Sequence, residues 1–222
     1  MPRVSINQLA TYLVATPSQR RRILRDAKAP ATFRVNWYDF ARSSIEAFVG
    51  GGMADDSILT NESQRLLDLE PTNEFEETRH RTNAEAIDSF LDCFDQIQTN
   101  GMELTLGPNA SNPTVVHDIE ISVRPEFLIS GDYRNSPTCG GVKLYFSKAD
   151  PLTNVSAPYI TAALMQHIQN HHQPDGHSTR HQNCQVVDVF GGQVHSAPRA
   201  ITRRFADIEA ACQEIGLIWP TV

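Results

Sequence analysis

Two segments in the middle of the chain alternate apolar and polar residues with a period of two, the pattern of a strand with one buried face. The first runs from His117 to Ile129 and the second from Gly141 to Phe146. The connection between them, residues 131–140, is rich in turn formers, so we expect the two strands to pair as an antiparallel hairpin. In that hairpin Glu126 and Lys143 share one face of the sheet.

Apolar residues recur with helical spacing in seven other segments. The expected helices are Val4–Val14, Pro17–Ala27, Tyr38–Val49, Ser57–Leu69, Asn83–Gln98, Asn154–Gln169 and Ala200–Ile215. Three more strands are expected at Met102–Leu106, Gln185–Phe190 and Gln193–Ala197, and the polar stretch Glu70–Arg81 is expected to be a loop.

From residue 83 onward the expected order of elements is α-β-β-β-α-β-β-α. Three consecutive strands before the next helix favour a mixed α/β (α+β) fold with a mixed central sheet over a doubly wound one. We therefore expect a helical N-terminal region over residues 1–82, packed on an α/β core over residues 83–222.

Composition limits the class of protein. With 222 residues, 40% of them hydrophobic, the chain is long enough to bury a core, and it lacks the ~20-residue apolar run of a membrane helix. The four cysteines are scattered and the first residues lack a signal-peptide pattern, which predicts reduced thiols and a cytoplasmic location. The net charge of −7 argues against non-specific coating of nucleic acid but leaves room for a local basic groove. Arg20–Arg22 and Arg25 form a basic face on the second expected helix.

The expected hairpin carries the strongest candidate chemistry. A carboxylate and a lysine on neighbouring strands are a minimal set for metal-assisted phosphodiester cleavage. Asp118 and Glu120 share the face of Glu126, but a rise of ~3.3 Å per residue puts them roughly 20 Å or more away, too far to bind one ion with it. The alternative interpretation is an ordinary surface hairpin.

The order of elements, together with Arg124-Pro-Glu126 and Gly140-Gly-Val-Lys143, resembles the PD-(D/E)xK nuclease-like superfamily. Pro125-Glu126 stands at the P-D position and Gly141-Val-Lys143 at the (D/E)-x-K position, with Gly141 in place of the second carboxylate. The resemblance covers about Asn83 to Ile215. The same region is similar to that of uncharacterised bacterial proteins of comparable length.

The resemblance implies roles for individual residues. Glu126 and Lys143 would be catalytic. A Mg²⁺ or Mn²⁺ ion would be held by Glu126 with a helical carboxylate, Glu85 or Asp88, with Asp92 or Glu46 as further candidates. Arg124 and Tyr145 would contact the substrate.

A second group of candidate ligands is formed by histidines. His167 and His171 are spaced i,i+4, and His172, His177, His181 and Cys184 follow closely. Imidazoles at this spacing can bind Zn²⁺, although the polar segment 170–182 is more typical of a solvated loop.

Two classes of function follow. The first is a divalent-metal-dependent nuclease, a hydrolase acting on DNA or RNA in repair or defence. The second is a catalytically inactive member of the same fold that binds nucleic acid, or that binds a protein partner through its N-terminal helices. No membrane partner is expected.

Overall fold

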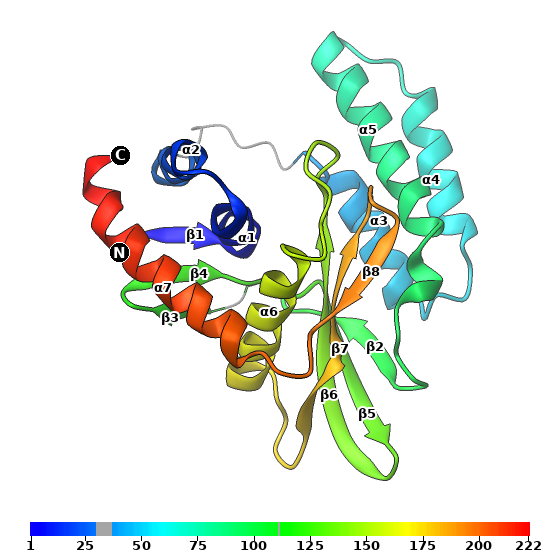
Figure 1. Cartoon of the computed structure of the whole chain (residues 1–222). Coiled ribbons are helices and arrows are strands. Elements are labelled where there is room, and N and C mark those ends of the chain that lie inside the picture. The colour runs from blue at the N-terminus through cyan, green and yellow to red at the C-terminus, as the bar shows by residue number, and fades with distance from the viewer. Residues whose placement is uncertain (30–36, 111) are drawn as a thin grey trace.

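The structure is a computed structural model that describes residues 1–29, 37–110 and 112–222. It confirms the predicted α+β class: a central five-stranded mixed sheet carries helices on both faces, and a three-stranded sheet lies beside it (Figure 1). None of the helices in these ranges combines the length and the hydropathy that crossing a membrane requires.

The central sheet has the strand order β2-β5-β6-β7-β8. Strands β2, β5 and β6 pair antiparallel, β7 follows parallel to β6, and β8 pairs antiparallel with β7. The parallel connection runs through helix α6 (Ala157–His171). The bounds are Glu103–Leu106 for β2, Phe127–Tyr133 for β5, Ser136–Tyr145 for β6, Ser178–Asp188 for β7 and Gln193–Ser196 for β8. The central sheet thus has the predicted order of three strands, a helix and two strands.

The predicted long strand His117–Ile129 was wrong, because the segment is divided between two sheets. Strands β3 (Thr114–Val116) and β4 (Ile119–Ser122) form a hairpin whose turn, His117 and Asp118, has positive φ angles of 47° and 61°. Strand β4 also pairs in parallel with β1 (Arg3–Ser5). Pro125, which has no N–H to donate to a ladder, lies in the crossing segment before β5.

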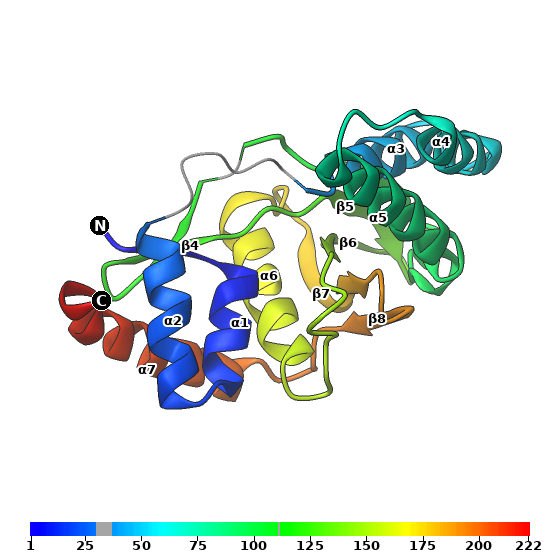
Figure 2. The same ribbon diagram turned by 90° about the horizontal axis from the view of Figure 1, so that it is seen from above.

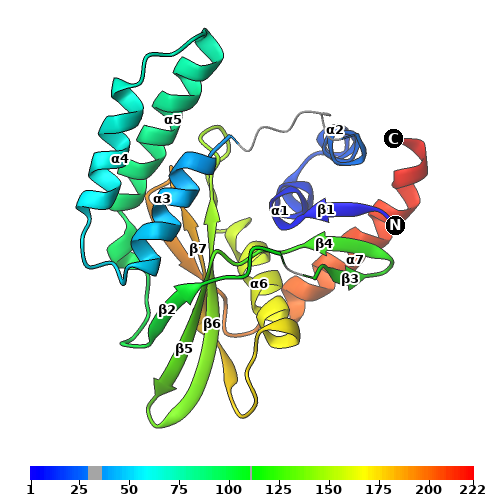
Figure 3. The same ribbon diagram turned by 180° about the vertical axis from the view of Figure 1, so that it is seen from behind.

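Helices α3 (Asp39–Gly50), α4 (Ser57–Asp68) and α5 (Glu74–Leu91) cover one face of the central sheet, and α4 and α5 extend beyond its edge (Figure 3). The predicted loop Glu70–Arg81 was partly wrong, since α5 already begins at Glu74. The Asn73 side chain caps it by accepting from the Glu76 N–H at 3.0 Å. Residue 83, the expected start of the core, lies inside α5. The helix ends at Leu91, and a short 3₁₀ turn, η1 (Phe94–Gln96), follows.

The other face of the sheet is covered by α6, on which α1 (Ile6–Val14), α2 (Pro17–Lys28) and α7 (Thr202–Ile218) build a further helical layer (Figure 2). A capping box starts α1, because Ser5 and Gln8 bond each other's main-chain N–H groups. A short 3₁₀ helix, η2 (Trp219–Thr221), follows α7. Two apolar cores therefore lie on opposite faces of the central sheet, one under α3–α5 and one under α6.

Candidate functional site

Glu126 and Lys143 meet, as the expected pairing of the two strands requires. Strand β5 begins with Phe127 opposite Val142, so Glu126 lies just before the paired residues and opposite Lys143. The Glu126 side chain is fully buried, and its Oε2 lies 3.7 Å from the Lys143 Nζ. The same oxygen accepts the Leu144 N–H at 2.8 Å. The carboxylate thus satisfies a main-chain donor that lies beyond the paired part of β5.

Helix α3 supplies a second cation to Glu126. Arg42 forms an ion pair through Nη1 with the Glu126 Oε1. One turn further along the same helix, Glu46 Oε1 lies 3.1 Å from the Arg124 Nη2. We call these five residues, Arg42, Glu46, Arg124, Glu126 and Lys143, the ion cluster. It connects α3 to the start of β5 and to β6.

Lys143 is almost completely buried in this cluster, with 9% of its side chain exposed. Burial lowers the pKa of Lys143 from its ordinary value; the adjacent Glu126 carboxylate opposes this effect, and Arg42 and Arg124 add to it. Its ammonium donates to the main-chain oxygen of Arg124 at 3.2 Å. Lys143 therefore makes two contacts with the segment before β5, an ion pair with the Glu126 side chain and a hydrogen bond to the Arg124 main chain.

Gly141 occupies the position where the resembling family has a second carboxylate. A Cβ atom there would lie 2.8 Å from Ile168 Cδ1 on α6 and 3.3 Å from the Phe127 main-chain oxygen. The first contact is shorter than van der Waals packing allows, and the second, to backbone, is tight. A side chain at position 141 therefore requires the Ile168 side chain to move and the Phe127 main chain to give slightly.

The residues expected to hold a metal ion do not fit that role. Glu126 is bonded by Arg42, Lys143 and the Leu144 N–H, and Glu46 is paired with Arg124. Within the described residues, no group of three or more His, Cys, Asp or Glu side chains is arranged to hold a metal ion.

Glu85 and Asp88 belong to a different hollow, between α5, the segment that follows β6 and the turn that follows β7. Glu85 is paired with Lys148 at 2.7 Å, and Asp88 and Asp92 line the same hollow. The structure thus brings Glu126 and Lys143 together and leaves the two helical acids apart from them.

The two expected substrate contacts differ in accessibility. The Arg124 side chain is 34% exposed and is held by Glu46. Tyr145 is buried, and its hydroxyl donates to the Asp150 main-chain oxygen at 2.8 Å. Arg42, which sequence reasoning had not connected with the site, is the principal partner of Glu126. The signal available was its i,i+4 spacing from Glu46 on a helix with one apolar face.

The histidines gather at the end of α6. His167 is fully buried, its ring lies 4.7 Å from that of His171 and 5.2 Å from that of His172, and its Nδ1 lies 3.1 Å from the Thr114 Oγ1. His181, expected in a loop, belongs to β7, and its Nδ1 lies 3.0 Å from the main-chain oxygen of Ala197. In the described part of the chain these histidines form no metal-binding group.

Helix α2 presents a cationic surface. Leu24 faces the core, whereas Arg21, Arg22 and Arg25 are exposed. Among the described residues, none of these three arginine side chains has an ion-pair or hydrogen-bond partner. The helix contains one acidic residue, Asp26. In a protein of net charge −7, this is a local concentration of positive charge.

No protein-family model matches the chain, and no curated protein matches its sequence.

Proposed function

We propose that this protein is a non-catalytic nucleic-acid-binding module built on a nuclease-like core. The observation that carries the proposal is the exposed arginine face of α2, formed by Arg21, Arg22 and Arg25, whose side chains have no partner within the described part of the chain. Arginines without a protein anion are available to phosphate oxygens, which supply most of the sequence-independent affinity for nucleic acid.

The nuclease-like part of the proposal is supported by topology and by the ion cluster. The resemblance rests on the order helix, three strands, helix, strand. The central sheet and its helices follow this order along the chain, with α5, then β2, β5 and β6, then α6, then β7. Glu126, just before β5, lies opposite Lys143 of β6, and the two side chains form an ion pair.

The non-catalytic part of the proposal is supported by the partners of the Glu126 carboxylate, both of whose oxygens are bonded within the protein. Two cations and a main-chain N–H bond it, and Ile168 fills the space next to Gly141. In this arrangement the carboxylate neutralises buried charge and fastens α3 to the sheet, which is a structural role.

The proposal is tested by fluorescence anisotropy with labelled single-stranded DNA, duplex DNA and RNA over a range of salt concentrations. We expect binding that weakens as salt rises. The variant Arg21→Gln/Arg25→Gln is expected to bind at least one probe more weakly and to reduce the slope of log affinity against log salt by about 2. The matched control, Arg81→Gln/Arg134→Gln, removes two exposed arginines elsewhere and is expected to bind normally. Absence of binding, or equal effects of the two variants, contradicts the proposal.

Incubation of the same probes with Mg²⁺ or Mn²⁺ tests the assigned lack of catalysis. We expect the probes to stay intact. Cleavage that disappears in Lys143→Met would identify the chain as a metal-dependent nuclease and would overturn the structural role of the ion cluster.

A further inference from the structure

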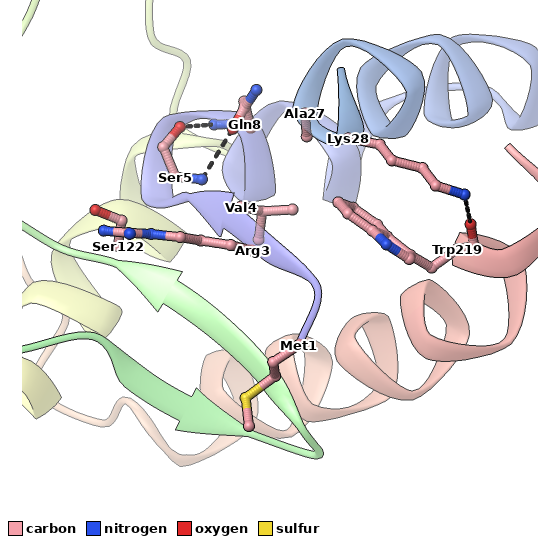
Figure 4. A pocket seen from close by; sticks show the side chains of 9 residues that line it. All are labelled: Met1, Arg3, Val4, Ser5, Gln8, Ala27, Lys28, Ser122 and Trp219. Carbon is pink, nitrogen blue, oxygen red and sulfur yellow. Dashed lines mark hydrogen bonds between the residues drawn. The ribbon is translucent and has the colours of Figure 1, made fainter. Parts of the chain in front are cut away.

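A hollow of about 450 Å³ lies where β1, β4, the end of α2 and η2 meet. Its lining combines charge, hydroxyl groups and an aromatic ring, contributed by Arg3, Val4, Ala27, Lys28, Ser122 and Trp219 (Figure 4). The volume is that of a small-ligand site. The ion cluster contributes no residue to it.

One end of the hollow carries an available guanidinium. Arg3 is exposed and extends toward Ser122 (Figure 4). Its neighbour across the β1–β4 ladder is Glu120, yet Arg3 forms no ion pair or hydrogen bond with any described residue. A free guanidinium beside a hydroxyl group is suited to a phosphate.

The other end carries the half-buried indole of Trp219, on the side away from the Arg3 guanidinium (Figure 4). Lys28 Nζ donates to the main-chain oxygens of Trp219 and Val222 at 2.9 and 2.8 Å. These two bonds fasten η2 to the end of α2 and so hold the indole at the wall of the hollow. A fixed aromatic ring is a surface on which a nucleic-acid base can stack.

The arginine face of α2 leads into this hollow. Arg21, Arg25 and Lys28 are spaced i, i+4 and i+7, so they follow one side of the helix over about 10 Å, and Lys28 lines the hollow. The arginine face of α2 and the hollow are therefore continuous.

We propose that the hollow binds one unpaired base of single-stranded nucleic acid, stacked on Trp219 with its phosphate on Arg3, while the adjoining strand follows the α2 arginines. The inference rests on the proposed function and narrows its substrate class. A base in a duplex is enclosed by its neighbours and its partner, whereas an unpaired base can leave the stack at low cost and enter a pocket.

The two tryptophans of the chain, Trp37 and Trp219, make the site directly observable. Trp37→Phe leaves Trp219 as the only indole, and Trp219→Phe leaves Trp37, which donates to Thr82 away from the hollow. We expect a single-stranded oligonucleotide to quench the emission of the Trp37→Phe protein, because a base stacks on its indole. The emission of the Trp219→Phe protein is expected to change little, and duplex of the same sequence is expected to quench neither protein.

Affinity measured by anisotropy provides the second readout. Trp219→Ala is expected to weaken single-strand binding roughly 10-fold, the effect of one lost stacking contact. Arg3→Gln changes an exposed side chain that has no described partner, so it leaves the fold intact, and it is expected to weaken single-strand binding as well. Trp37→Phe serves as the control and is expected to bind normally.

The outcomes separate the two proposals. In one outcome, binding depends on Arg21 and Arg25, but Trp219 emission does not change and Arg3→Gln binds normally. This result overturns the proposal that the hollow binds a base, and it supports the nucleic-acid-binding function. Equal binding of single strands and duplex, without quenching, overturns the single-strand assignment. Absence of binding to any probe overturns both.

Discussion

Glu126 is the residue on which the sequence-based and structural views differ most. A motif places it as a metal ligand, but in the structure it is the central anion of the ion cluster, bonded by Arg42, Lys143 and a main-chain N–H. A buried charge is tolerated only when partners replace the water it has lost, and each partner in turn relies on that charge. The cluster is therefore sensitive to removal of its anion.

We expect Glu126→Ala to lower the free energy of unfolding by about 3–5 kcal/mol, because the substitution leaves Lys143 buried without its carboxylate and the Leu144 N–H without its acceptor. Urea denaturation gives the value. Glu62→Ala, which breaks the more exposed pair with Arg65, is the control and is expected to cost less than about 1 kcal/mol. If both variants lose the same small amount, the cluster does not stabilise the fold.

At the scale of secondary structure, a contact between His167 and Thr114 joins the end of α6 to the three-stranded sheet. The distance from the His167 Nδ1 to the Thr114 Oγ1 is 3.1 Å. Burial lowers the pKa of His167 from 6.5 to about 4, and the nearby His171 and His172 act in the same direction. Above pH 6.5 the imidazole is neutral in both the folded and the unfolded chain. Between 6.5 and 4 only the unfolded chain takes up the proton.

We therefore expect His167 to reduce stability as the pH falls from 6.5 to 4, by up to about 3 kcal/mol. Urea denaturation at a series of pH values measures the effect as the difference between the wild type and His167→Gln, in which this part of the loss is absent. His117→Gln changes an exposed histidine and is expected to keep the full pH dependence. A wild-type curve parallel to that of His167→Gln would contradict the assignment.

How far the elements could be predicted depended on how each one is stabilised. Helices with an apolar stripe, such as α3 and α7, were predicted within a few residues, because the stripe is visible in the sequence. The first turns of α5 are polar and were missed, although Asn73 followed by Glu74, Glu76 and Glu77 is a helix-start pattern. The break at Pro125 was missed because alternation continues across it and does not reveal a change of sheet.

The candidate site shows the same division. The Glu126–Lys143 pair could be predicted, because the pairing of two neighbouring strands determines it. Arg42 could not, because it lies on a helix 84 residues earlier in the chain, and only packing brings the two together. The closed space beside Gly141 depends on Ile168 of α6 and is likewise a product of packing.

At the scale of the whole molecule, the buried cysteines are distributed over both apolar cores. Cys93 lies in the core under α3–α5, Cys139 and Cys212 lie in the core under α6, and Cys184 is fully buried on β7. All four are free thiols, as predicted. Burial raises the pKa of Cys93 to about 11 and those of Cys184 and Cys212 to about 12, and it raises the pKa of Cys139 as well.

We expect the folded protein to react very slowly with a chromogenic disulfide reagent near pH 8, because its thiols are both protonated and shielded. Unfolding in urea is expected to make all four react. The rate in the absence of urea is expected to follow global unfolding, since the thiols are buried on both faces of the central sheet. Rapid labelling of one thiol in the folded state would show that part of the molecule opens independently.

The parallel pairing of β1 with β4 has a consequence for how the molecule is made. Residues 3–5 find their ladder partners only at residues 120–122, and α1 packs on α6 and α7, which come later still. A chain leaving the ribosome therefore exposes the apolar sides of its first two helices until nearly all of the sequence has been synthesised. Chaperones that bind nascent chains are expected to act first on this N-terminal segment. In a chain that stops before α7, the side of α1 that packs on α7 stays exposed.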